Sequence, residues 1–112
     1  MNYLCRRVAN WMNIMADYLK QTRQLIQKLK PTLVSQYHIG SIGLFGSIVR
    51  NDFKPDTSDV DIVVDFTQSV GIEFIDLAEL LEEKLKRRVD VVSRKGVKEK
   101  YLKEIEKEIV YV

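Results

Sequence analysis

Residues 60–66, VDIVVDF, carry the strongest strand signal in the chain. The segment is rich in β-branched and apolar residues, and Pro, Asp and Ser precede it, as is typical of the start of a strand. Two shorter runs, GSIGLF at 40–45 and RVDVVS at 88–93, have the same character. Because helix-like segments separate these runs, the pattern predicts a layered α/β domain.

Three segments space their apolar residues as an amphipathic helix does. From about residue 13 to residue 37 the spacing is helical, but Pro31 lacks an N–H donor and clashes with the preceding turn. We therefore expect a second short helix to begin at Pro31. Residues 97–109 predict the last helix. Residues 72–86 predict another, and its expected inward side chains are Ile72, Ile75, Leu80, Leu81 and Leu85.

Length and charge limit the classes of protein to which the chain can belong. A chain of 112 residues has room for one core, and its net charge of +2, with acids and bases interleaved, does not favour direct nucleic-acid binding. The lone Cys5 excludes an internal disulfide and fits a reducing compartment. No apolar run approaches the roughly 18 residues of a membrane helix, and no signal peptide is evident. We expect a cytoplasmic protein.

Two aspartates stand at the head of the 60–66 strand. Asp59 and Asp61 are two residues apart, so their side chains project to the same face. Carboxylates this close repel each other unless a cation lies between them, and oxygen ligands suit Mg²⁺. Asp90, in the 88–93 strand, would complete a set of three. Such sets hold two metal ions in nucleotidyl transfer, one activating the attacking oxygen and the other stabilising the leaving pyrophosphate.

Gly46 and Ser47 follow the 40–45 strand and precede a short helical turn expected at 48–52. Backbone N–H groups at such a turn favour a phosphate, and glycine lets the phosphate approach the backbone. Arg50 could add a charge-assisted contact. These residues therefore predict a nucleotide site, with phosphates on the Gly-Ser turn and metals on the carboxylates.

The Gly-Ser turn, the Asp-x-Asp pair and the later Val89-Asp90 together resemble the DNA polymerase β-like nucleotidyltransferase superfamily, in its minimal single-domain branch (MNT). The resemblance covers residues 15–112 as the nucleotidyltransferase domain and leaves residues 1–14 as an N-terminal extension. It departs from the family pattern in two places. Arg50 is followed by Asn51 where glycine is usual, and the eleven residues between Ser47 and Asp59 are one more than usual. Asparagine tolerates left-handed backbone conformations.

The resemblance implies a small mixed β-sheet with helices packed on one side. It also implies Mg²⁺, ATP as substrate, and a partner, because MNT proteins are commonly antitoxins to HEPN-domain ribonuclease toxins. Some of them transfer AMP to a tyrosine of the toxin. On this basis we expect a nucleotidyltransferase in which Asp59 and Asp61 hold both metals. Asp90 would bind the metal ion that activates the acceptor hydroxyl.

Two other functions stay open at this point. The first is a catalytically silent antitoxin that acts by binding alone. The second is a nucleotidyltransferase that acts on a small molecule or RNA. Homo-oligomerisation is also open. Outside the candidate site we expect four residues to be structural or solvent-facing and one thiol to be inert: Asp65, His38, Arg94, Lys95 and Cys5.

The chain ends in four apolar residues, Ile109 to Val112. We expect this tail to form part of a partner interface, because contiguous exposed apolar surface usually marks one. The alternative is that the tail folds back as an edge strand.

Overall fold

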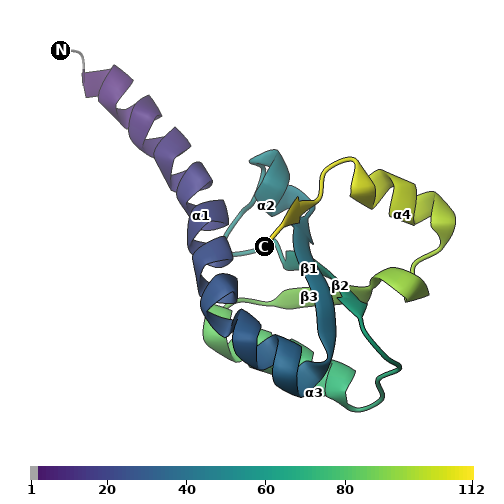
Figure 1. Cartoon of the computed structure of the whole chain (residues 1–112). Helices are drawn as coiled ribbons and strands as arrows, with labels where there is room; N and C mark the ends of the chain where they lie inside the picture. The colour runs from purple at the N-terminus through teal and green to yellow at the C-terminus, as the bar shows by residue number, and fades with distance from the viewer. Residues whose placement is uncertain (1–2) are drawn as a thin grey trace.

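The computed structural model describes the backbone of residues 3–112 and the side chains of residues 18–112. In this part of the chain four strands form one mixed sheet in the order β3-β2-β1-β4 (Figure 1). Strands β2 and β3 are parallel, and β1 is antiparallel to both β2 and β4. The strands are β1 (Ile39–Phe45), β2 (Val60–Phe66), β3 (Val89–Ser93) and β4 (Val110–Tyr111).

Helices α1 and α3 pack on one face of the sheet, as expected, and form the core together with the strands. The helices are α1 (Tyr3–Tyr37), α2 (Ser47–Arg50), α3 (Glu73–Leu85) and α4 (Glu99–Glu106), with a 3₁₀ turn η1 (Arg94–Gly96). Helices α1 and α3 contact each other. The fully buried side chains come from α1, α2, α3, β1 and β2: Ile26, Leu33, Ile39, Ile42, Leu44, Ile48, Val60, Ile62, Val64, Leu77 and Leu81. By contrast, α4 contributes no buried residue.

Helix α1 runs through Pro31 without interruption, so the prediction of a separate helix beginning there is wrong. The helix also begins at Tyr3, well before the expected residue 13. Pro31 and Gln27, whose carbonyl loses its helical donor, are both exposed, so water can satisfy that carbonyl. The helix axis changes direction in its C-terminal part, as proline in a helix causes (Figure 1). Within residues 3–112 no helix is long and apolar enough to cross a membrane.

The inward face of α3 differs from the expected one. Leu77, Leu81 and Leu85 are buried, at four-residue steps. Ile72 and Ile75 are 71% and 58% exposed, so their expected burial is wrong. A helix that begins at Glu73 places the 77–81–85 stripe against the sheet, and Ile75 then falls on the opposite side because successive residues turn by 100°.

The predicted helix at 97–109 ends early, and the C-terminal tail is a strand. Helix α4 stops at Glu106, and β4 pairs with β1 through Gly43 and Leu44. The Val112 N–H donates to the Ile42 carbonyl at 3.0 Å, which extends this pairing. The alternative that the tail folds back as an edge strand is therefore confirmed, since β4 is the last strand of the sheet beside β1. A partner interface at this tail stays a prediction. Figure 1 shows the C-terminus lying beside β1.

Candidate active site

The structure brings Asp61 and Asp90 together across two neighbouring strands. Their α-carbons are partners in the parallel register of β2 and β3. Burial raises the pKa of Asp61 to about 6, and the negative charges of Asp90 and then Asp59 add to the effect. A carboxyl that is half-buried beside two others ionises less readily than one in water. This is the electrostatic setting in which a bound cation is stabilising.

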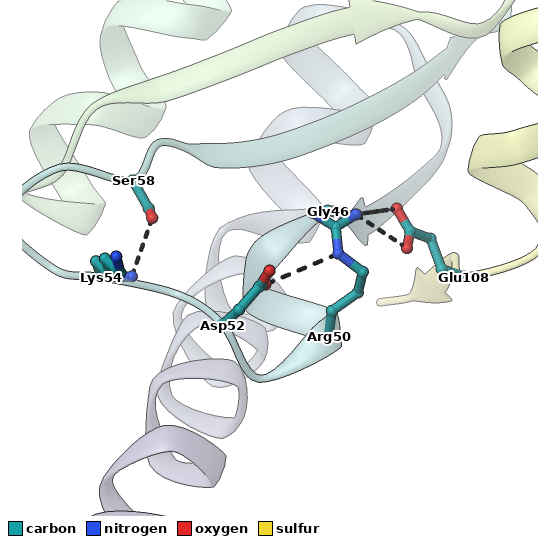
Figure 2. Close-up of polar contacts among 6 residues, drawn as sticks. All are labelled: Gly46, Arg50, Asp52, Lys54, Ser58 and Glu108. Carbon is teal, nitrogen blue, oxygen red and sulfur yellow. Dashed lines mark hydrogen bonds and ion pairs between the residues drawn. The ribbon is translucent and has the colours of Figure 1, made fainter.

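Asp59 lies just before β2 and is engaged in an ion pair. Its Oδ1 is 3.1 Å from Arg88 Nε, and the Asp59 side chain is 48% exposed. The loop before it is closed by Ser58, whose Oγ accepts from the Lys54 N–H at 2.9 Å (Figure 2). Among the described side chains, no three His, Cys, Asp or Glu residues converge closely enough to hold a metal. Asp59 therefore contributes its charge to the site, while its carboxylate is turned to Arg88.

Gly46 follows β1 in a backbone conformation that requires glycine. Its φ of 77° and ψ of −150° are essentially closed to residues with a side chain. A β-carbon built there would lie 2.1 Å from Asp61 Oδ2, so the aspartate carboxylate abuts the glycine. The Gly46 carbonyl accepts hydrogen bonds from the N–H groups of Val49 and Arg50, which starts α2. The Gly-Ser turn is thus adjacent to the Asp61 carboxylate.

Arg50 extends from α2 to a residue that the sequence does not single out, Glu108. Arg50 Nη1 donates to both carboxylate oxygens of Glu108, at 3.1 and 3.2 Å (Figure 2). The Gly46 N–H donates to Glu108 Oε1 at 3.0 Å. The hydrogen bond and charge of Glu108 raise the pKa of Arg50. Because 62 residues separate Glu108 from Gly46, no local pattern could connect the two.

Asn51 takes over the role that glycine has in the family pattern. Its φ is 67° in the left-handed region, and its N–H donates to the Ser47 carbonyl at the end of α2. The Asp52 N–H also donates to that carbonyl, at 3.2 Å. The expected tolerance of asparagine for this conformation is confirmed. The turn keeps its shape without glycine.

The residues expected to lie outside the site have mixed outcomes. His38 follows α1 with a φ of 58°, and its carbonyl accepts from the Thr67 N–H, so it is a helix-end residue as expected. Asp65 Oδ1 is buried without a hydrogen-bond partner. Arg94 differs from the expected solvated loop residue, because its guanidinium donates to the Tyr111 hydroxyl at 2.7 Å and pairs with the Glu106 carboxylate.

Two further expectations concern Lys95 and Cys5. Lys95 is exposed, in agreement with the expected solvated loop. Cys5 lies outside the residues whose side chains the structure describes.

Comparison with known proteins agrees with the motifs and the fold. The sequence model of the nucleotidyltransferase domain matches residues 26–112. The protein adenylyltransferase MntA of Thermococcus cleftensis is 39% identical over 95 residues, which cover 84% of this chain and 95% of that protein. A solved structure described as a minimal nucleotidyltransferase has a TM-score of 0.69 at 25% identity, over 82% of this chain and 93% of that one.

A solved variant of the toxin–antitoxin MntA–HpeT shares the fold, with a TM-score of 0.63 at 20% identity, over 80% of this chain and 70% of that one. The domain match spans most of the chain, and the MntA relative is matched over nearly its full length. The resemblance drawn from the Gly-Ser turn and the aspartates is thereby confirmed. The chain belongs to the nucleotidyltransferase domain family of enzymes.

Proposed function

We propose that this protein transfers AMP from ATP to a hydroxyl group, with Mg²⁺ as the metal and a tyrosine of a HEPN-like helical toxin as the acceptor. The observation that carries the proposal is the contact between Asp61 and Gly46. A β-carbon on Gly46 would lie 2.1 Å from Asp61 Oδ2, so the carboxylates and the Gly-Ser turn share one site. A nucleotide whose phosphates lie on the turn would thus bring its metal ions to the carboxylates.

The chemistry of the donor set suits a divalent cation once Asp59 turns from Arg88 towards the other two carboxylates. Asp59, Asp61 and Asp90 offer carboxylate oxygens, which Mg²⁺ prefers. Burial, and then the charges of Asp90 and Asp59, raise the pKa of Asp61, and a cation beside it would favour the ionised carboxylate. Asp59 would exchange its ion pair with Arg88 for the metal. When bound, the metal supplies activation of the attacking oxygen and stabilisation of the leaving pyrophosphate.

The remaining residues bind and orient the substrates. The backbone of Gly46 and Ser47 would hold the β,γ-phosphates, and Arg50 would add a charge-assisted contact. The acceptor oxygen forms a bond to the α-phosphorus while the bond to the bridging oxygen breaks, and pyrophosphate leaves. Asp90 is exposed at the edge of the site, where it can accept the proton of the acceptor hydroxyl.

The proposed acceptor is a hydroxyl of a partner protein. It is supported by the resemblance to minimal nucleotidyltransferases and by a relative named protein adenylyltransferase. A solved neighbour of the same fold is described as a toxin–antitoxin pair. The class of partner that follows is a toxin that presents a hydroxyl to this site.

The experiment is co-expression of this protein with the product of the adjacent small reading frame, followed by size exclusion and intact mass. The proposal predicts a complex and a partner mass increased by whole AMP units, lost when Asp61→Asn is used. A complex with no added mass in the wild type would indicate a silent antitoxin. Labelling of RNA or a small molecule, with no complex, would contradict the proposed acceptor.

A further inference from the structure

Glu108 occupies the donors that the proposed function assigns to the nucleotide. The residue lies in the turn between α4 and β4, and its carboxylate reaches back to α2 (Figure 2). Its Oε1 accepts from the Gly46 N–H at 3.0 Å, and both oxygens accept from Arg50 Nη1 at 3.1 and 3.2 Å. Two of the groups proposed for phosphate binding are thus bonded to an anion of the protein itself.

A carboxylate and a phosphate compete for such donors because both are anions with oxygens that accept charge-assisted hydrogen bonds. One backbone N–H directs its hydrogen at one acceptor, so the Gly46 N–H cannot fully serve both. We propose that Glu108 is an internal competitor for the nucleotide: it holds Gly46 and Arg50 in the nucleotide-free protein and leaves when the phosphates arrive. This inference rests on the proposed function. It adds that Glu108 lowers the affinity of the same site for the nucleotide.

The surroundings of Glu108 allow it to move while the sheet stays intact. Its side chain is 24% exposed, and α4 before it has no buried residue. Strand β4 after it is anchored independently, since the Val112 N–H donates to Ile42 and Lys30 Nζ donates to the Val112 carbonyl at 2.7 Å. Release of the carboxylate therefore needs a rotation of the side chain and a loosening of the 107–109 turn, with the strand left in place.

The charges favour release once a nucleotide is bound. Glu108 adds negative charge beside Asp61, because both carboxylates contact Gly46. A triphosphate at the same position would meet this charge as well. After release, Arg50 can pair with phosphate in place of Glu108, so the arginine exchanges one anion for another and is never left unpaired.

The test measures MgATP binding by calorimetry for the wild type, Glu108→Gln and Glu106→Gln. Glutamine keeps an oxygen for the Gly46 N–H and removes the charge, so the turn should fold as before. Glu106→Gln is the matched control, because it removes an acid near the end of α4 that pairs with Arg94 and does not contact Gly46 or Arg50. We expect Glu108→Gln to bind MgATP about tenfold more tightly, since its competition is weakened. The control should match the wild type.

A second measurement needs no variant: hydrogen–deuterium exchange of the wild type with and without MgATP. Exchange in the 107–109 turn should rise on binding while that of β4 stays unchanged. Equal or weaker binding by Glu108→Gln, with wild-type protein that does bind MgATP, would overturn the inference and leave Glu108 as a support of the turn. If neither protein bound MgATP, the proposed function itself would fail, and the inference with it.

Discussion

The carboxylate of Asp61 lies against the α-carbon of Gly46. A β-carbon at Gly46 would meet Asp61 Oδ2 at 2.1 Å and Asp61 Cγ at 3.1 Å. Gly46 follows β1 and Asp61 belongs to β2, so this contact joins the Gly-Ser turn to the Asp61 carboxylate. Glycine is required here both by the close approach of Asp61 and by the positive φ of Gly46.

The first prediction is that Gly46→Ala destabilises the protein by about 2 kcal/mol or more, because alanine strains the backbone and displaces Asp61. Urea unfolding measures the change in the free energy of unfolding. Gly71→Ala is the control, since an added β-carbon there meets nothing closer than 3.8 Å and its φ is not positive. Equal stability of the two variants would show that the approach of Asp61 to Gly46 is not a constraint.

The second prediction concerns pH in metal-free buffer. The pKa of Asp61 is raised from 3.8 to about 6, so between these values the folded protein binds more protons than the unfolded chain. Stability due to this group is therefore present at low pH and is lost as pH rises through about 6.

Asp61→Asn removes this dependence. Relative to wild type, the variant should gain on the order of 1 kcal/mol of stability between pH 4 and pH 7, a figure reduced for the solvent screening of a half-buried group. Thermal or urea unfolding across this pH range measures the difference. A difference that does not change with pH would mean that Asp61 ionises normally in the fold.

The third prediction distinguishes the two faces of α3. Leu77→Ala should cost about 2–5 kcal/mol because it leaves a cavity in the core. Ile75→Ala, at a side chain that is 58% exposed, should change stability by about 0.5 kcal/mol or less. Urea denaturation of both variants provides the comparison, and a larger loss for Ile75→Ala would place the wrong face of the helix against the sheet.

The fourth prediction assigns Asp90 to the acceptor side of the reaction. Asp90→Asn should lower kcat by about a hundredfold or more, because the variant cannot accept the acceptor proton. The affinity for ATP should stay close to that of the wild type, since Asp90 is not among the residues proposed to hold the phosphates. Loss of ATP binding with kcat unchanged would reverse this assignment.

Local chemistry was sufficient to predict the strands and the pairing of Asp61 with Asp90. The sequence predicts the 60–66 strand with its observed bounds, because its β-branched residues pack well on a half-buried pleated sheet. The strand at Val110–Tyr111 corresponds to the alternative of a folded-back edge strand. The sequence could not decide for it, since helical spacing continues past Glu106 and only the open edge of β1 makes a strand of the tail. The face of α3 depends on where that helix begins.

The role of Glu108 could not be predicted from the sequence for a related reason. Its contacts with Gly46 and Arg50 cross 62 and 58 residues of chain, and a lone acid near the end of a helical pattern has no distinguishing spacing. The turn that carries it to the site exists only because α4 stops and β4 pairs with β1. Such contacts are set by tertiary structure alone.

The central claim is that the aspartates beside the Gly-Ser turn bind a nucleotide through Mg²⁺. The most direct measurement is calorimetric titration of ATP into the wild type, Asp61→Asn and Asp65→Asn, each with Mg²⁺ and with EDTA. Asp65 lies four residues further along the same strand and is the matched control. The account predicts metal-dependent binding by the wild type and Asp65→Asn, with that dependence lost in Asp61→Asn. Equal ATP affinity in Mg²⁺ and EDTA for the wild type would contradict it.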